Sequence, residues 1–176
     1  MNAAFTYPAD FILIAAMNPC PCGYLGDPQR ECTCTDGEIR RYGQKISGPL
    51  LDRIDLHVSV MRPKYSELTA TIQGEPSCDI AKRVAEARAV QAERLSRWHM
   101  QSNAQMGHRQ LKETCQLDAE GTEMLRVVFE KLHLSARSYD RIIKVARTIA
   151  DLAGSDQIRP EHVAEAISFR NMINGK

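Results

Sequence analysis

Four cysteines near the start of the chain have the residue type and spacing of a metal site. They form two Cys-x-Cys pairs, Cys20/Cys22 and Cys32/Cys34, with nine residues between the pairs. Four thiolates can hold one tetrahedral Zn²⁺, and such a closed shell leaves no position for catalysis, so the predicted site is structural. The alternative is a loop with four reduced thiols, because the pairs lack the commoner Cys-x-x-Cys spacing.

A polar residue, Asn18, precedes these cysteines. It ends the apolar run Phe11–Met17 and is followed by Pro19, which has no amide hydrogen for a sheet ladder. The run predicts a strand that is buried on both faces. Because open α/β sheets build ligand sites at the carboxyl ends of their strands, Asn18 is a candidate ligand-binding residue. The alternative is that Asn18 only caps the junction between strand and turn.

A second strand and two short helices are predicted before residue 64. Ile54–Val60 alternates apolar and polar residues, which indicates a strand, and the polar segment 36–44 predicts a short helix. Ser47 followed by Gly-Pro is typical of a helix start. Two strands cannot form a stable sheet alone. We therefore expect further strands before residue 1, in a longer protein of which this chain is the C-terminal part.

The pattern becomes helical after a loop-like stretch at 64–76. Apolar spacing predicts four helices, at about 79–98, 118–132, 135–153 and 160–170. The predicted fold is therefore an α/β portion with few strands over residues 1–63, followed by an all-α domain over residues 64–176, and mainly α overall.

The first of these helices is basic, which raises the question of a nucleic-acid contact. Its cations are Lys82, Arg83, Arg88, Arg94 and Arg97. They could contact DNA phosphates. An ordinary solvated face is the favoured interpretation, because glutamates are interleaved with them and aromatic residues are not.

Composition and charge limit the partners and the cellular compartment that we expect for this chain. The formal net charge is +1, so the overall balance does not demand a nucleic-acid partner. No apolar run approaches the ~18 residues of a membrane span. The first residues lack the charged and apolar regions of a signal peptide. We therefore expect a cytoplasmic protein with no membrane partner, in which clustered cysteines are more often metal ligands than disulfides.

Three long blocks of the sequence resemble one protein family. They are AAMNPCPCGY at 15–24, SGPLLDRID at 47–55, and LSARSYDR at 134–141 continuing as VARTIADL at 145–152. Together they resemble the C-terminal part of magnesium-chelatase-like AAA+ ATPases, most nearly the competence-related ComM/YifB type. The resemblance implies a protein that forms a ring, usually hexameric, and couples hydrolysis of ATP with Mg²⁺ to work on a partner. For the ComM type that partner is thought to be branched DNA.

The resemblance also assigns roles to single residues. Asn18 matches the sensor 1 position, where a neutral amide can orient the attacking water, and Arg53 matches an arginine finger that enters the neighbouring subunit's nucleotide site. Arg137 matches sensor 2, with Arg141 one turn further on as the rival. Each has a plainer alternative: Arg53 as a surface ion pair with an adjacent aspartate, and Arg137 as a helix-surface cation.

The motifs that hold nucleotide in this family are missing from these residues. The chain contains no G-x-x-x-x-G-K-[ST] phosphate loop and no apolar run that ends in Asp-Glu to hold magnesium. We therefore expect the full-length protein to be an ATPase and this fragment alone to be inactive. Two alternatives remain open: a zinc-stabilised helical module that binds nucleic acid or protein, and the ATPase subunit of a magnesium chelatase.

Overall fold

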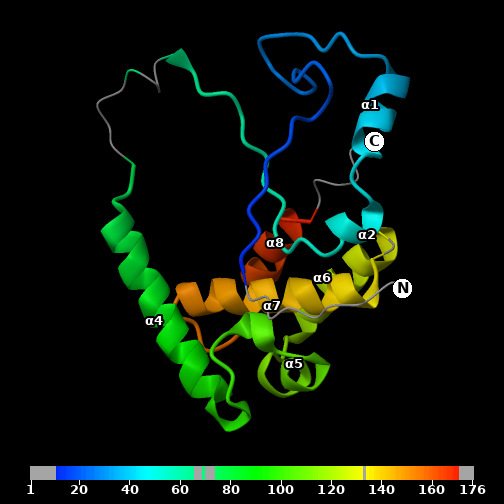
Figure 1. Cartoon of the computed structure of the whole chain (residues 1–176). Helices are drawn as coiled ribbons and strands as arrows, with labels where there is room; N and C mark the ends of the chain where they lie inside the picture. Colours follow the sequence, from blue (N-terminus) through cyan, green and yellow to red (C-terminus); the bar gives the residue numbers. More distant parts are fainter. Residues whose placement is uncertain (1–10, 66–68, 70–73, 133, 171–176) are drawn as a thin grey trace, which may run out of the picture. The chain divides into compact units, whose positions relative to one another are not determined.

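The computed structural model describes residues 11–65, 69, 74–132 and 134–170 (Figure 1). Residues 1–10 lie outside the described ranges, and so do residues 66–68 and 70–73 of the loop predicted at 64–76. The described part is mainly helical, as expected. The chain divides into two compact units, residues 1–46 and 47–176. The predicted division into domains at residue 63 stays a prediction.

The first unit consists of a loop that carries the cysteines and the short helix α1 (Asp36–Gly43). Thr35 begins the helix with a capping box: its Oγ1 accepts from the Glu38 amide at 3.3 Å, and Glu38 Oε2 accepts from the Thr35 amide at 2.9 Å. Among residues 11–46, Cys20 is the one buried residue. Residues 11–46 therefore form no hydrophobic core of their own.

The strand predicted at Phe11–Met17 is not formed in this structure. The segment has no ladder partner, and its apolar side chains are exposed, with Phe11 at 75% and Ile14 at 90%. A strand is stabilised by pairing with another strand, and the described residues contain none to pair with it. The expectation of burial on both faces is accordingly wrong for the chain as it stands.

The second unit begins with the one-turn helix α2 (Gly48–Leu51), close to the predicted start. Ser47 is its N-cap, with Oγ accepting from the Leu50 amide at 3.3 Å. The strand predicted at Ile54–Val60 is also absent: the Ile54 amide donates to the nearby Leu51 carbonyl at 3.1 Å, and the His57 amide donates to the Phe169 carbonyl at 3.0 Å, but no strand ladder is formed. Within the described ranges, β-type pairing is limited to one isolated parallel bridge, between residues 117 and 158.

The rest of the second unit is helical, and its four longest helices overlap the four predicted ones (Figure 1). The elements are α4 (Ser77–Leu95), the 3₁₀ turns η1 (Ser96–Trp98) and η2 (Asn103–Gln105), α5 (His108–Thr114), α6 (Ala119–Lys131), α7 (Ala136–Leu152) and α8 (Pro160–Ser168). Side-chain caps start two of them: Asp118 accepts from the Gly121 amide, and Ser135 accepts from the Ser138 amide. Gly154 ends α7 with a φ of +64°, which favours glycine.

Helix α7 is the centre of the second unit. It packs against α8, α4 and α5, and α6 packs against α8. The shared core is apolar and is drawn from these helices and from the segments that connect them: Leu95, Met106, Leu111, Cys115, Leu125, Ile142, Ile143, Ala146, Ala150, Ile158, Val163, Ala166 and Ile167. Only the second half of the apolar stripe of α4 is buried. Ala87, Gln91 and Leu95 are buried, whereas Ile80 and Val84, nearer the start of the helix, are exposed.

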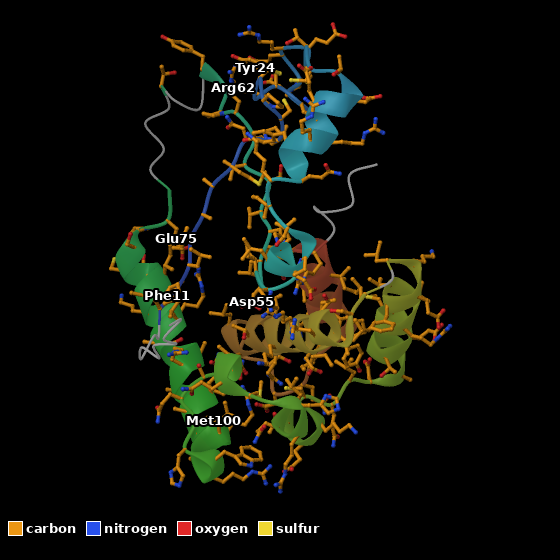
Figure 2. The ribbon with its side chains drawn as sticks, turned by 45° about the vertical axis from the view of Figure 1, so that its right-hand side comes forward. Phe11, Tyr24, Asp55, Arg62, Glu75 and Met100 are labelled. Atoms are coloured by element: carbon orange, nitrogen blue, oxygen red, sulfur yellow. The ribbon has the colours of Figure 1, made fainter. Side chains whose placement is uncertain are left out.

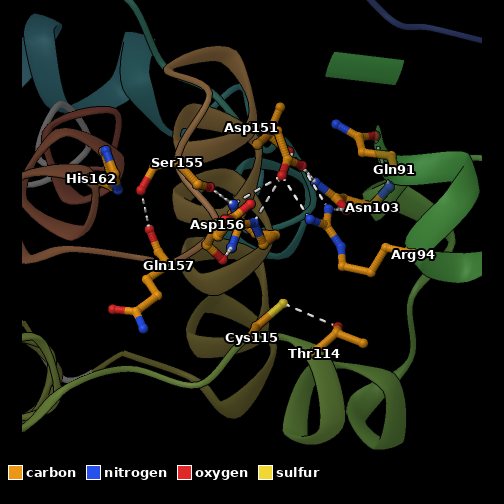
Figure 3. A network of polar contacts seen from close by, with 12 residues as sticks. Gln91, Arg94, Asn103, Thr114, Cys115, Asp151, Ser155, Asp156, Gln157 and His162 are labelled. Carbon is orange, nitrogen blue, oxygen red and sulfur yellow. Dashed lines mark hydrogen bonds and ion pairs between the residues drawn. The ribbon is translucent and has the colours of Figure 1, made fainter. Parts of the chain in front are cut away.

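A buried polar network joins α4 to α7 (Figure 3). The side chain of Asp151 is fully buried and accepts two hydrogen bonds from Arg94, at 2.8 and 2.7 Å. Arg147 Nε donates to the same carboxylate at 3.0 Å, and Asn103 Nδ2 donates to it at 2.9 Å. One carboxylate therefore compensates two guanidinium groups inside the helical unit.

We expect Asp151→Asn to destabilise the helical unit by about 3 kcal/mol, because it leaves two guanidinium groups without their counter-charge. Urea unfolding followed by helical circular dichroism measures this loss. The matched control is Glu113→Gln, since Glu113 pairs with Arg97 and Arg109 on the surface and such pairs contribute about 1 kcal/mol or less. Equal stability of the two variants would contradict the assigned role of Asp151.

Candidate functional site

The four clustered cysteines meet as the sequence predicts. Their Sγ atoms all lie within 4.8 Å of one another, and Cys20 Sγ lies 3.4 Å from Cys22 Sγ and 3.6 Å from Cys32 Sγ. A zinc ion with four Zn–S bonds of about 2.3 Å requires sulfur atoms about 3.8 Å apart. All four are free thiols. The donor set and its spacing therefore fit one tetrahedral zinc.

Tight turns bring the two cysteine pairs together. Gly23 has a φ of +83°, and its amide donates to the Cys20 carbonyl at 3.1 Å, which turns the chain back directly after the first pair. Further along, Arg30 lies over the ring of Tyr24 and donates to its hydroxyl at 2.8 Å. The second pair ends at Cys34, immediately before the cap of α1. Local contacts thus hold the first part of the loop, and helix α1 begins directly after its end.

Electrostatics in the cluster also favour a cation. The backbone amide of Tyr24 stabilises the Cys22 thiolate and lowers its pKa to about 5. At Cys34 the amide of Cys22 acts in the same direction, but desolvation and the neighbouring thiols outweigh it and raise the pKa to about 12. Four thiolates so close together repel one another. A bound divalent cation would allow all of them to ionise.

Asn18 lies on the same turn as the first cysteine pair. It is exposed, and its side-chain amide approaches Gly23 closely: a Cβ atom at Gly23 would lie 3.7 Å from Asn18 Nδ2. The structure therefore places Asn18 beside the loop that carries the cysteines. Arg53 and Arg137 belong to the second unit.

Arg53 follows the C-cap of α2 and is exposed. Its Nη1 donates to the Pro49 carbonyl at 3.0 Å. Within the described ranges it forms no ion pair with Asp52 or Asp55, so the simple ion pair considered from the sequence is not formed here. Its guanidinium is held close to its own helix and faces solvent.

The two rival arginines of α7 have different surroundings. Arg141 is mostly buried: its Nη1 donates to the Asp52 carbonyl at 3.0 Å and lies 3.3 Å from Asp55 Oδ1, the side chain labelled in Figure 2. Arg137, one turn earlier, is exposed and makes no hydrogen bond or ion pair in the described part of the chain. The guanidinium of Arg141 thus already binds two protein groups, whereas that of Arg137 binds none among the described residues.

The structure adds Asp52, which sequence reasoning treated only as a neighbour of Arg53. Its carboxylate accepts a very short hydrogen bond from Ser138 Oγ and one of 3.2 Å from Ser135 Oγ. The bond from Ser138, then the one from Ser135, lowers the pKa of Asp52 against the opposing effect of desolvation. No local sequence pattern indicates this contact, because Ser135 and Ser138 are more than 80 positions away from Asp52 in the sequence.

The basic face of α4 is largely neutralised within the described chain. Three of the four cations of α4 are in ion pairs: Lys82 with Asp79, Arg83 with Glu75 and Arg94 with Asp151. Arg97, which the structure places in η1, pairs with Glu113. This pairing favours the ordinary solvated face over a DNA-binding surface. None of the described helices is long and apolar enough to cross a membrane.

Family models match nearly the whole chain. The model for the magnesium chelatase subunit ChlI matches residues 1–68, and the model for the C-terminal region of the same subunit matches residues 74–170. The chain therefore belongs to the magnesium-chelatase-like family of AAA+ proteins.

Curated relatives of the ComM/YifB type agree with this assignment. The competence protein ComM of Haemophilus influenzae is 39% identical over 174 residues, which are 98% of this chain and 33% of the relative. The YifB protein of Escherichia coli is 40% identical over 171 residues, 96% of this chain and 32% of YifB. A Mycobacterium tuberculosis protein, Rv2897c, is 39% identical over 164 residues. The chain spans about a third of the length of these relatives.

Proposed function

We infer that this chain is the part of a ring-forming AAA+ ATPase that supplies sensor 1, the arginine finger and sensor 2. The observation that carries this proposal is the family match over nearly the whole chain, in which Asn18, Arg53 and Arg137 fall within the matched residues. In such enzymes the transferred phosphoryl group is stabilised mainly by positioning and charge, and these three side chains provide a neutral amide and two cations.

The state of Arg53 supports a role between subunits. A finger must reach a phosphate on another chain, so it cannot be neutralised by a carboxylate of its own chain. Arg53 meets this requirement, since it is exposed and, among the described residues, its side chain contacts the Pro49 carbonyl and no carboxylate. In the proposed mechanism its guanidinium binds the oxygens of the transferred phosphoryl group in the neighbouring subunit.

The surroundings of the two arginines favour Arg137 as sensor 2. Arg141 already contacts a backbone carbonyl and Asp55, so a phosphate would have to displace both. Arg137 is exposed on the first turn of α7, where its guanidinium can bind the γ-phosphate without loss of an existing contact. Its position on the helical unit would link that unit to the state of the nucleotide.

The partner of the motor is proposed to be DNA, in a hexameric ring that uses ATP and Mg²⁺. This rests on the likeness to the ComM type, whose Haemophilus relative is named a competence protein. The ATPase subunit of a magnesium chelatase is the second candidate, because the matching family models are those of ChlI. The thiol cluster is proposed to hold one structural Zn²⁺, which would fix the loop beside Asn18.

The assignment of sensor 2 is tested in the full-length protein by ATP affinity. Arg137→Ala is expected to weaken ATP binding roughly tenfold to a hundredfold, as for loss of a charged hydrogen bond. Arg141→Ala should leave the affinity within about twofold, because that guanidinium already binds protein groups. Arg126→Ala is the matched control, since Arg126 pairs with Glu123 and Glu130 on the surface of α6. The reverse pattern would assign sensor 2 to Arg141.

A further inference from the structure

We propose that Asp52 is a positioning residue that fastens the segment of Arg53 to the first turns of α7, so that the finger moves with the helical unit. This inference rests on the proposed function of Arg53. It concerns how that arginine is held, and not which atoms it touches.

The first attachment is the carboxylate of Asp52. It accepts hydrogen bonds from Ser138 and Ser135, at the N-terminal end of α7. Ser138 is 4% exposed and Asp52 is half-buried, so the bond between them is partly shielded from water. The positive end of the helix dipole adds to the attraction of a carboxylate at this place.

The second attachment is Arg141, which lies one turn further along α7. Its guanidinium binds the Asp52 carbonyl at 3.0 Å and the Asp55 carboxylate at 3.3 Å. Arg53 lies between these two aspartates in the sequence. The segment is therefore held to α7 on both sides of the proposed finger, while the side chain of Arg53 itself stays exposed.

Local hydrogen bonds make this short segment stiff. The amides of Asp52 and Arg53 donate to the carbonyls of Gly48 and Leu50 at 2.8 and 2.9 Å. A stiff segment that is bound at two points follows the helix to which it is bound. Any shift of α7 is then passed to the backbone of Arg53.

Capping of α7 does not explain the hydrogen bond between Ser138 and Asp52. Ser135 already caps the helix, because its Oγ accepts from the Ser138 amide at 3.1 Å. The hydroxyl of Ser138 is not required for that cap, yet it donates to Asp52. Arg137, the proposed sensor 2, is the residue directly before Ser138. Nucleotide contact and attachment of the finger would thus occur on the same turn of one helix.

The attachment itself is tested on this chain by hydrogen exchange. Asp52→Ala and Ser138→Ala should each speed exchange of the Asp52, Arg53 and Ile54 amides about tenfold, because a charged hydrogen bond that limits local opening is lost. The double variant should add little to Asp52→Ala, because Asp52→Ala already removes the bond that Ser138 donates. Ser138→Ala preserves the helix, since alanine is the best helix former. Unchanged exchange at these amides would overturn the attachment.

The functional consequence is tested in the full-length protein by turnover. Asp52→Ala and Ser138→Ala should lower kcat about tenfold and leave ATP affinity unchanged, because Arg53 is misplaced but not removed. Combining either with Arg53→Ala should cost nothing further. Glu123→Gln, on the surface of α6, is the control. Normal turnover of Asp52→Ala with faster exchange would overturn the coupling alone, whereas normal turnover of Arg53→Ala would overturn the proposed function on which it rests.

Discussion

Replacement of Arg53 by alanine is expected to reduce ATP hydrolysis by the full-length protein about a thousandfold or more. ATP binding and ring assembly should be retained, because ground-state binding depends mainly on the phosphate loop and on magnesium. The finger stabilises charge that develops in the transition state, so its loss affects kcat rather than affinity. Single-turnover hydrolysis and ATP titration, measured on the same variant, separate the two quantities.

Mixed rings give this prediction a second signature. A finger serves the neighbouring subunit, so chains with Arg53→Ala should recover some activity when mixed with chains that are inactive in their own phosphate loop. Activity would arise at interfaces that pair an intact loop with an intact Arg53. The control is Arg109→Ala, because Arg109 is an exposed arginine of α5 that pairs with Glu113. Near-normal turnover of Arg53→Ala, without complementation, would remove Arg53 from the active site.

Removal of zinc is expected to unfold the first unit and to leave the helical unit intact. Elemental analysis of protein purified without chelator should give about one zinc per chain. Because Cys20 is the one buried residue among residues 11–46, no hydrophobic core would hold these residues after the metal is lost. Structural zinc in small domains contributes apparent binding free energies of about 10–16 kcal/mol, so the effect of a chelator should be large.

Two variants separate the metal effect from general damage. Cys32→Ser should lower the zinc content and speed exchange of the α1 amides, because α1 begins directly after the second cysteine pair. Cys78→Ser should change neither, since Cys78 is exposed and lies outside the cluster. Protein without metal, whose four cluster thiols react freely and whose melting is unaffected by chelator, would contradict the zinc site.

The helices could be predicted because each is specified by residues close to it in the sequence. For α7, apolar residues recur at helical spacing, Ser135 caps one end and Gly154 ends the other. The cysteine cluster was predictable for the same reason, since its four donors lie on one short loop. Local information was sufficient for these features.

The sheet and the contacts of the site depend on residues far apart, and local patterns did not specify them. The apolar run at Phe11–Met17 indicates a strand correctly only where partner strands exist, and the described residues provide none. The bond between Ser138 and Asp52 spans 86 positions, and the pair of Arg94 with Asp151 spans 57. Neither pairing follows from charge or spacing in one sequence.

The half-buried state of α4 has a mechanical consequence. The buried residues of this 19-residue helix, Ala87, Gln91 and Leu95, all lie in its second half. Ser77, at its start, is ten residues from Ala87, a distance of about 15 Å at 1.5 Å per residue. A helix held at one end is a lever arm: a tilt of about 10° at the anchored end displaces the other by about 3 Å. Small rotations of the helical core therefore become large displacements at the start of α4.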